Sequence, residues 1–315
     1  SLFFICILFS CHSLTAQSTR WKIRLDSANV FSSPRFADLN NDGIKDVVVG
    51  AGVENVPVSN GVLAINGQDG SILWKASAPT QIYTSALFHD ITGDATPDVF
   101  IGGRAGCLYA INGASGEIIW QFWEGTQRKS LEQGILNFFL TQWLDDQNKD
   151  GYPDLLVTNG GDYLVPPNDS NRAISNLMVV SGKDGAVIAK AKMPEKRESY
   201  YAPHTYGSGE NTKVVFGTGG ETINGGLWEV PLSHLLNNDI QKSTLIISDS
   251  AKGFILNSIM TDLNGDSKLD FVNARMNAVI SAVDGDKRKT LWEHSFKGFE
   301  CYVTPSLGEF TGDKT

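Results

Sequence analysis

The chain has 315 residues, of which 41% are hydrophobic and 19% charged, a balance typical of a globular protein with a large core. The 35 acidic residues outnumber the 26 Lys and Arg, giving a formal net charge of −9, and no basic stripe is present, which argues against nucleic-acid binding. The 32 glycines and the 10% aromatic content favour many short strands joined by tight turns.

An uncharged apolar run extends from Ser1 to Cys11. It is too short to cross a bilayer as a helix and is typical of an export signal. We therefore expect a signal peptide over residues 1–16 and a secreted, periplasmic or cell-surface protein. A second interpretation, a lipobox ending at Cys11, would make that cysteine a lipid anchor. No later segment is apolar for long enough to span a membrane.

A nine-residue acidic pattern recurs four times along the chain. It starts at Asp38, Asp90, Asp146 and Asp262 and reads DLNNDGIKD, DITGDATPD, DQNKDGYPD and DLNGDSKLD. Residues 206–217 keep the strand that follows the pattern but lack its acids, which indicates a degenerate fourth unit. Residues 309–313 begin a sixth unit. The interval of about 47 to 61 residues is the size of one propeller blade.

Strand-like runs accompany each unit. An apolar, mostly β-branched run follows the pattern at 47–49, 99–101, 155–157 and 214–216. Farther on, a pattern from Ala to Trp predicts a third and a fourth strand joined by a Gly turn, at 64–74, 110–120 and 282–292. Four antiparallel strands per unit predict an all-β propeller over residues 17–315, incomplete at its C-terminus. We expect at least six blades, and seven or eight in the complete protein.

The two halves of the unit resemble two groups of known repeats. The acidic half, with Gly50-Ala51-Gly52 after it, resembles the FG-GAP repeats of integrin α-chain propellers and of related bacterial proteins. The Ala-to-Trp half resembles the Trp motif of quinoprotein-like (PQQ-type) propellers, which include outer-membrane assembly lipoproteins. The resemblance covers about residues 30–315 and implies a fold without implying one activity, since propellers carry many functions.

The acidic loops have the residue types and the spacing that Ca²⁺ needs. Calcium takes six to eight oxygen ligands, which side chains at positions 1, 3, 5 and 9 and a carbonyl at position 7 can supply. An EF-hand is excluded because position 12 lacks Glu and strands, not helices, flank the loop. We expect about four structural calcium sites, held by Asp38, Asn40, Asp42, Ile44, Asp46, Asp90, Thr92, Asp94, Thr96, Asp98, Asp146, Asn148, Asp150, Tyr152, Asp154, Asp262, Asn264, Asp266, Lys268 and Asp270.

No convincing catalytic set is present in the sequence. There is no nucleophile elbow and no phosphate loop. A bound quinone is not expected, because the chain lacks a vicinal cysteine pair and its acids belong to the repeat loops.

Two insertions, Trp123–Gly134 and Gly160–Asn176, point to a ligand site instead. Both are predicted on the propeller face opposite the acidic loops, because connections between second and third strands share that face with the links between blades. Aromatic and Arg side chains there suit a protein or glycan ligand. The candidate residues are Arg104, Trp123, Tyr163, Arg172, Tyr201 and His204.

The sequence thus predicts a calcium-stabilised binding or adhesion module. Two alternatives remain open. One is an enzyme, either a polysaccharide lyase or hydrolase or a quinoprotein-like oxidoreductase. The other is a periplasmic assembly scaffold.

Overall fold

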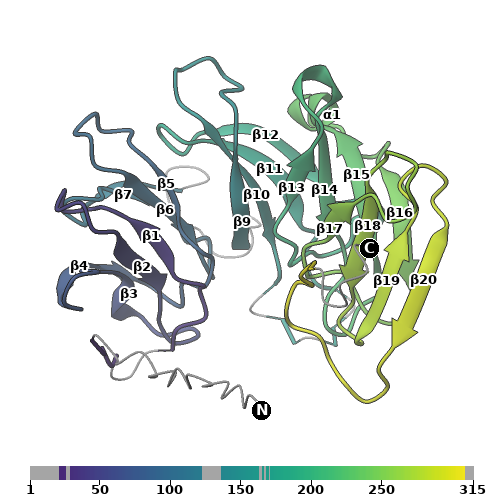
Figure 1. Ribbon diagram of the computed structural model, residues 1–315, viewed down its shortest axis with the longest axis horizontal. Helices are drawn as coiled ribbons and strands as arrows, with labels where there is room; N and C mark the ends of the chain where they lie inside the picture. Colours follow the sequence, from purple (N-terminus) through teal and green to yellow (C-terminus); the bar gives the residue numbers. More distant parts are fainter. Residues whose placement is uncertain are drawn as a thin grey trace, which may run out of the picture.

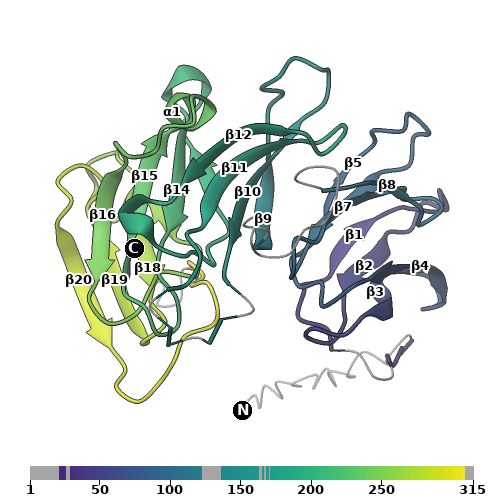
Figure 2. The ribbon, with the colours of Figure 1, turned by 180° about the vertical axis from the view of Figure 1, so that it is seen from behind.

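The computed structural model describes residues 21–25, 29–122, 136–162, 165–166, 168–169 and 171–308. In this part of the chain twenty strands form five sheets of four consecutive strands, and paired strands are antiparallel. Figure 1 shows the five sheets following one another in an arc, and Figure 2 shows the same arc from behind. The protein is an all-β propeller, which confirms the predicted fold class. The predicted signal peptide, Cys11 and the start of the sixth unit lie outside the described residues.

Each blade is built from one repeat unit. Short helices occur at Pro194–Lys196, Gly209–Asn211 and α1 (Leu232–Leu236), and no helix in the described ranges has the length and apolarity needed to cross a membrane. The strands are, in blade one, β1 (Arg35–Ala37), β2 (Asp46–Gly50), β3 (Val58–Ile65) and β4 (Ile72–Ala78); in blade two, β5 (Leu87–His89), β6 (Asp98–Gly102), β7 (Leu108–Ile111) and β8 (Ile118–Gln121); in blade three, β9 (Asn137–Leu144), β10 (Asp154–Gly160), β11 (Asn176–Ser181) and β12 (Val187–Lys192); in blade four, β13 (His204–Tyr206), β14 (Lys213–Gly217), β15 (Gly225–Pro231) and β16 (Thr244–Asp249); in blade five, β17 (Ile259–Thr261), β18 (Asp270–Ala274), β19 (Val279–Val283) and β20 (Thr290–Ser295).

The connections fall at two ends of the sheets. The acidic loops join first to second strands in blades one, two, three and five, and in blade four the helix Gly209–Asn211 takes the same place. Antiparallel pairing puts these loops and the turns between third and fourth strands at one end, which we call the acidic end. The connections between second and third strands and the links between blades lie at the opposite end, which we call the open end. The 161–175 connection is one of these.

Tryptophan side chains connect neighbouring blades. Each packs on a glycine turn of the following unit, where an added Cβ at Gly70, Gly116 or Gly185 would come within 2.8 Å of the ring, so glycine is required. The indole N–H also donates to a backbone carbonyl of that turn. The three bonds run from Trp21 to Gly67 (3.0 Å), from Trp74 to Gly113 (2.6 Å) and from Trp120 to Gly182 (2.9 Å).

The segment 21–25 packs on blade one in the way that the fourth strand of one blade packs on the blade that follows it. Trp21, Ile23 and Leu25 pack against a buried cluster that includes Val49 and Leu63. In the same way, Trp74, Ala76 and Ala78 of β4 pack against the strands of blade two. The hydrophobic cores therefore lie between blades, and apolar burial fixes how one sheet sits against the next.

We expect the indole hydrogen bond to contribute measurably to stability. Trp120→Phe keeps an aromatic ring on the turn but leaves the buried Gly182 carbonyl without its donor, which is expected to lower the free energy of unfolding by about 1–3 kcal/mol. Trp292→Phe is the matched control, because Trp292 holds the equivalent position in blade five and is 39% exposed. For that control, urea unfolding is expected to show a change in the free energy of unfolding of no more than about 0.5 kcal/mol. Equal losses in both variants would contradict the assigned role of the bond.

Candidate functional site

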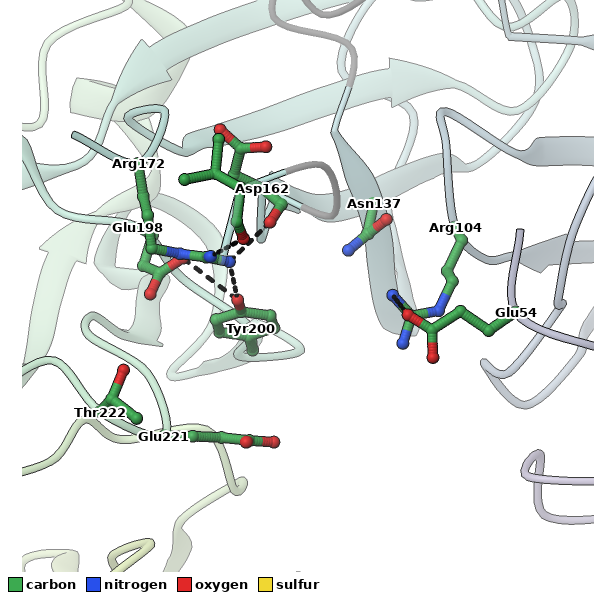
Figure 3. A pocket seen from close by; sticks show the side chains of 10 residues that line it. Glu54, Arg104, Asn137, Asp162, Arg172, Glu198, Tyr200, Glu221 and Thr222 are labelled. Atoms are coloured by element: carbon green, nitrogen blue, oxygen red, sulfur yellow. Dashed lines mark hydrogen bonds and ion pairs between the residues drawn. The ribbon is translucent and has the colours of Figure 1, made fainter. Parts of the chain in front are cut away.

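A pocket of about 230 Å³ lies at the open end, where connections from four blades meet (Figure 3). Because blade one and blade four both contribute to it, the pocket lies on the inner side of the arc. We call it the funnel mouth. It is lined by Glu54, Arg104, Asn137, Asp162, Val165, Arg172, Glu198, Tyr200, Glu221 and Thr222.

A second cavity of about 230 Å³ shares Tyr200 with the funnel mouth, and we call it the inner cavity. Its lining comes from the first strands of blades one and three and from segments just before the first strands of the other blades. Those strands and segments face the centre of the arc. The inner cavity therefore lies on the propeller axis. The lining residues are Arg35, Tyr83, Thr84, Ser85, Phe139, Leu140, Tyr200, Ala202 and Ile255.

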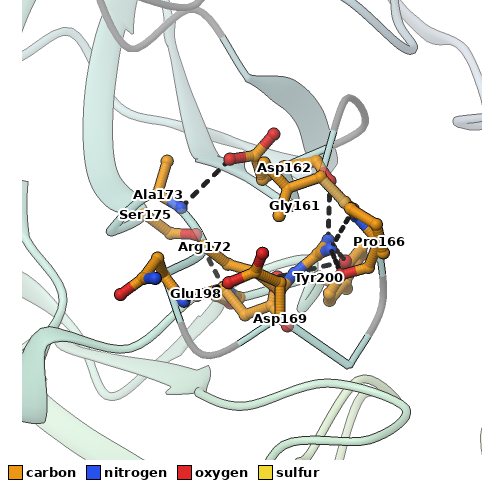
Figure 4. A network of polar contacts seen from close by, with 12 residues as sticks. Gly161, Asp162, Pro166, Asp169, Arg172, Ala173, Ser175, Glu198 and Tyr200 are labelled. Carbon is orange, nitrogen blue, oxygen red and sulfur yellow. Dashed lines mark hydrogen bonds and ion pairs between the residues drawn. The ribbon is translucent and has the colours of Figure 1, made fainter.

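Arg172 holds the 161–175 connection in place (Figure 4). Its guanidinium side chain is only 4% exposed and pairs with Glu198, which is 3% exposed. All five of its N–H groups have acceptors. They are the Glu198 carboxylate, the Tyr200 hydroxyl and the backbone carbonyls of Asp162, Val165 and Pro166. Arg172 therefore shapes the wall of the funnel mouth and has no N–H left to donate to a ligand.

Three further charged groups of the funnel mouth, Glu54, Arg104 and Glu221, come from blades one, two and four. Arg104 pairs with Glu54 across blades one and two, at 3.2 Å, and its Nε donates to the Gln81 side chain at 3.5 Å. Glu221, in the β14–β15 connection, is exposed and has no hydrogen-bond or ion-pair partner among the described residues. Figure 3 shows its carboxylate reaching into the open space below Tyr200.

Aromatic rings separate the funnel mouth from the inner cavity. Phe139 contacts Tyr83 on one side and Tyr200 on the other, with ring centroids 5.3 and 5.9 Å apart. Burial raises the pKa of the Tyr83 hydroxyl, and burial together with the Glu198 carboxylate raises the pKa of the Tyr200 hydroxyl. Both phenols are therefore protonated at neutral pH. The buried Tyr83 hydroxyl has no hydrogen-bond partner in the described part of the chain.

The predicted ligand residues have different locations. Arg104 and Arg172 line the funnel mouth. Trp123 and Tyr163 lie outside the described residues. Tyr201 and His204 are buried and in ring contact, with centroids 5.8 Å apart, and Tyr201 belongs to a hydrophobic core. Burial lowers the pKa of His204 to about 4, so its ring is neutral at pH 7.

Several lining residues were not among the sequence candidates. Glu198 and Tyr200 stand two residues apart in the link to blade four, next to the candidate Tyr201. Glu54 and Glu221 lie in connections between second and third strands, the same connection type that contains Arg104. A comparison of this connection across all blades could have found them.

The acidic loops use their side chains to bind their own backbone. In blade one, the amide of Asp42 donates to the side-chain oxygens of both Asp38 (3.2 Å) and Asn40 (3.0 Å), and Asp38 also accepts from the amide of Gly43. In blade three the amide of Asp150 donates the same pair of bonds, to the side-chain oxygens of Asp146 and Asn148. In these two loops, the side-chain oxygens at positions 1 and 3 of the nine-residue pattern therefore lie close together, at the amide of position 5. Within the described ranges, no three His, Cys, Asp or Glu side chains are grouped so as to hold a metal ion.

The aspartate at position 9 joins the acidic loop to the turn between the third and fourth strands. In blade two, Asp98 accepts from the amides of Ile91 (2.9 Å) and Thr92 (3.1 Å) with one oxygen and from Gly113 (3.1 Å) with the other. Asp98 is completely buried. The equivalent bonds in blades one and five go from Leu39 and Gly67 to Asp46, and from Leu263 and Gly285 to Asp270.

Blade three departs from this arrangement. Asp154 accepts from the amide of Gln147 at 2.6 Å, and the Gly182 amide favours its charged form, but its buried Oδ1 has no hydrogen bond of ordinary geometry among the described residues. Burial raises the pKa of Asp154 to about 6, and the Asp150 and Asp146 carboxylates raise it as well. A cation in this loop would satisfy the orphaned oxygen and relieve the repulsion, so loop 146–154 fits calcium best.

Comparison with known families identifies the propeller. A sequence model of the FAM234A/B beta-propeller family matches residues 57–315. The chain belongs to this family. The FAM234A/B match contains blades two to five and the β3–β4 hairpin of blade one, and with them most of the funnel mouth. No curated protein sequence matches the chain.

Solved structures resemble the FAM234A/B propeller in fold. BamB from Moraxella catarrhalis matches with a TM-score of 0.50 and 11% identity over 87% of this chain and 64% of that one. The quinohemoprotein alcohol dehydrogenase ADHIIG from Pseudomonas putida HK5 matches with a TM-score of 0.53 and 13% identity, over 88% of this chain and 43% of that one. The chain spans less than two thirds of the length of either structure, and at these identities the likeness shows the fold alone.

We expect the position-9 aspartates of this FAM234A/B propeller to stabilise it without any metal. Asp98→Asn leaves one acceptor oxygen where two are used and is expected to cost about 1.5–3 kcal/mol of unfolding free energy. The loss should persist in excess chelator, because the partners are backbone amides. Urea unfolding measures it, with the exposed Asp184→Asn as control. An effect of Asp98→Asn that disappears in chelator would instead make metal binding its role.

Proposed function

We propose that this propeller is a binding or adhesion module whose protein or glycan ligand enters the funnel mouth. The observation that carries the proposal is the convergence of connections from four blades on one polar pocket at the open end. Connections there vary without disturbing the strand pairing, and pockets on a rigid scaffold are common ligand sites. The apolar run at residues 1–11 supports export, so that the ligand would be met in a periplasmic or extracellular setting.

A steric block tests the location of this site without changing the charge. Thr222 is exposed at the funnel mouth, so Thr222→Trp should preserve the fold while filling the opening. We expect it to abolish ligand capture in a glycan-array and pull-down screen, because the side chain occupies the ligand's volume. The matched control is Thr290→Trp, at an exposed threonine of β20. Unchanged capture by Thr222→Trp, or loss only with substitutions in the acidic loops, would contradict the proposal.

We propose further that the acidic loops are FG-GAP-like calcium sites that stabilise their blades. Two features support this: the spacing of their oxygen ligands, and the orphaned buried oxygen of Asp154 in loop 146–154. In that loop the ligands would come from Asp146, Asn148, Asp150 and Asp154 and from the Tyr152 carbonyl. The bound ion would supply charge compensation and a connection between the first two strands of the blade.

Calcium is therefore expected to raise the thermal midpoint of the chelated protein. With a dissociation constant of about 10⁻⁴ M and about 10 mM calcium, one site adds about 2.7 kcal/mol to the unfolding free energy. Asp150→Asn should reduce this calcium-dependent gain, whereas Glu210→Gln, in the acid-poor loop of blade four, should leave it intact. Differential scanning calorimetry with and without calcium measures the gain. The same midpoint in chelator and in calcium would refute the calcium sites.

A further inference from the structure

The lining of the funnel mouth has an excess of negative charge. It contains four carboxylates, from Glu54, Asp162, Glu198 and Glu221, against the guanidinium groups of Arg104 and Arg172. Arg172 has acceptors for all its N–H groups, and Arg104 is paired with Glu54. Arg172 therefore has no N–H group left for an acidic ligand, and the charge of Arg104 is compensated in part by Glu54. Desolvating a carboxylate-bearing ligand against this lining would be unfavourable.

Two features of the pocket suit a cation. The Glu221 carboxylate extends into the open space with no hydrogen-bond or ion-pair partner among the described residues, where it can accept charged hydrogen bonds (Figure 3). Tyr200 lines the same pocket, and an aromatic ring attracts ammonium and guanidinium groups to its π-face. A sugar would meet acceptors at most positions and few free donors. The funnel mouth is thus better matched to a ligand group that only donates.

We propose, on the basis of the function above, that the funnel mouth binds a protonated nitrogen, an ammonium or guanidinium group. A lysine or arginine side chain of a protein and a free amine both carry such a group. The inner cavity has Arg35 as its only charged lining residue among those described, and Tyr83, Phe139 and Ile255 among its apolar ones. The cationic group therefore binds in the mouth beside Glu221, and the apolar part of the ligand points towards the inner cavity.

Titration calorimetry of the full chain with defined probes tests this inference. The probes are the peptide Ala-Ala-Lys-Ala-Ala with an acetylated N-terminus and an amidated C-terminus, the same blocked peptide with acetyl-lysine, and spermidine as a free amine. Acetylation removes the charge and should weaken binding by about tenfold or more. Glu221→Gln should weaken lysine-peptide binding by about threefold to fivefold, and added salt should weaken it further. Glu117→Gln, at an exposed glutamate of the β7–β8 turn at the acidic end, should change nothing. Tighter binding of the peptide than of spermidine would assign the cation to a protein ligand, and the reverse order to a free amine.

Two results would overturn the inference. One is equal binding of the lysine and acetyl-lysine peptides, or no binding of any amine probe at millimolar concentration. The other is a ligand from the glycan screen that is neutral or acidic and still competes for the funnel mouth. In both cases the Thr222→Trp block remains a separate test, so the binding function can stand while the cationic ligand is rejected.

Discussion

The packing of each blade on the next is the contact on which the rest of the structure depends, through apolar cores and, at Trp21, Trp74 and Trp120, through an indole ring on a glycine turn. The sheets are joined by covalent links at the open end, but their relative orientation comes from the cores between them and from the indole bonds of Trp21, Trp74 and Trp120. The funnel mouth contains residues of blades one to four, so no single blade contains the site. A small rotation at each contact between blades would add up over the arc and separate Glu54 from the side chains of blade four.

The two ends of the blades differ in how much sequence change the fold tolerates there. At the acidic end, Asp46, Asp98 and Asp270 accept backbone amides from two turns at once, so these positions tolerate little change. At the open end, the connections differ in length and composition from blade to blade, because they take no part in the sheet hydrogen bonds. The repeat therefore keeps one end constant and leaves the other available for recognition.

The fold could be predicted from the sequence more completely than the candidate site could. The repeat period and the β-branched runs were enough to predict the blades, including blade four, whose acids are missing. They also placed Arg104 and Arg172 at the open end. The sequence did not show which alternate residues of the link before blade four would face the funnel mouth. Glu198 and Tyr200 line the funnel mouth, whereas Ser199 and Tyr201, which alternate with them, are completely buried and do not line it. The pairing of Arg172 with Glu198, 26 positions apart, depends on how the 161–175 connection folds back, which periodicity does not encode.

The saturated guanidinium of Arg172 has a consequence for the thermodynamics of recognition. Its five hydrogen bonds join the 161–175 connection to the link before blade four without help from a ligand. The described residues that Arg172 binds are therefore held together without a ligand, and a ligand that packs against them would not have to compensate the conformational entropy of fixing them. Lysine could not replace Arg172 here, because three rotatable N–H groups cannot reproduce a planar fork that reaches two side chains and three carbonyls. One buried arginine thus sets the positions of two side chains and three carbonyls of the funnel mouth before any ligand arrives.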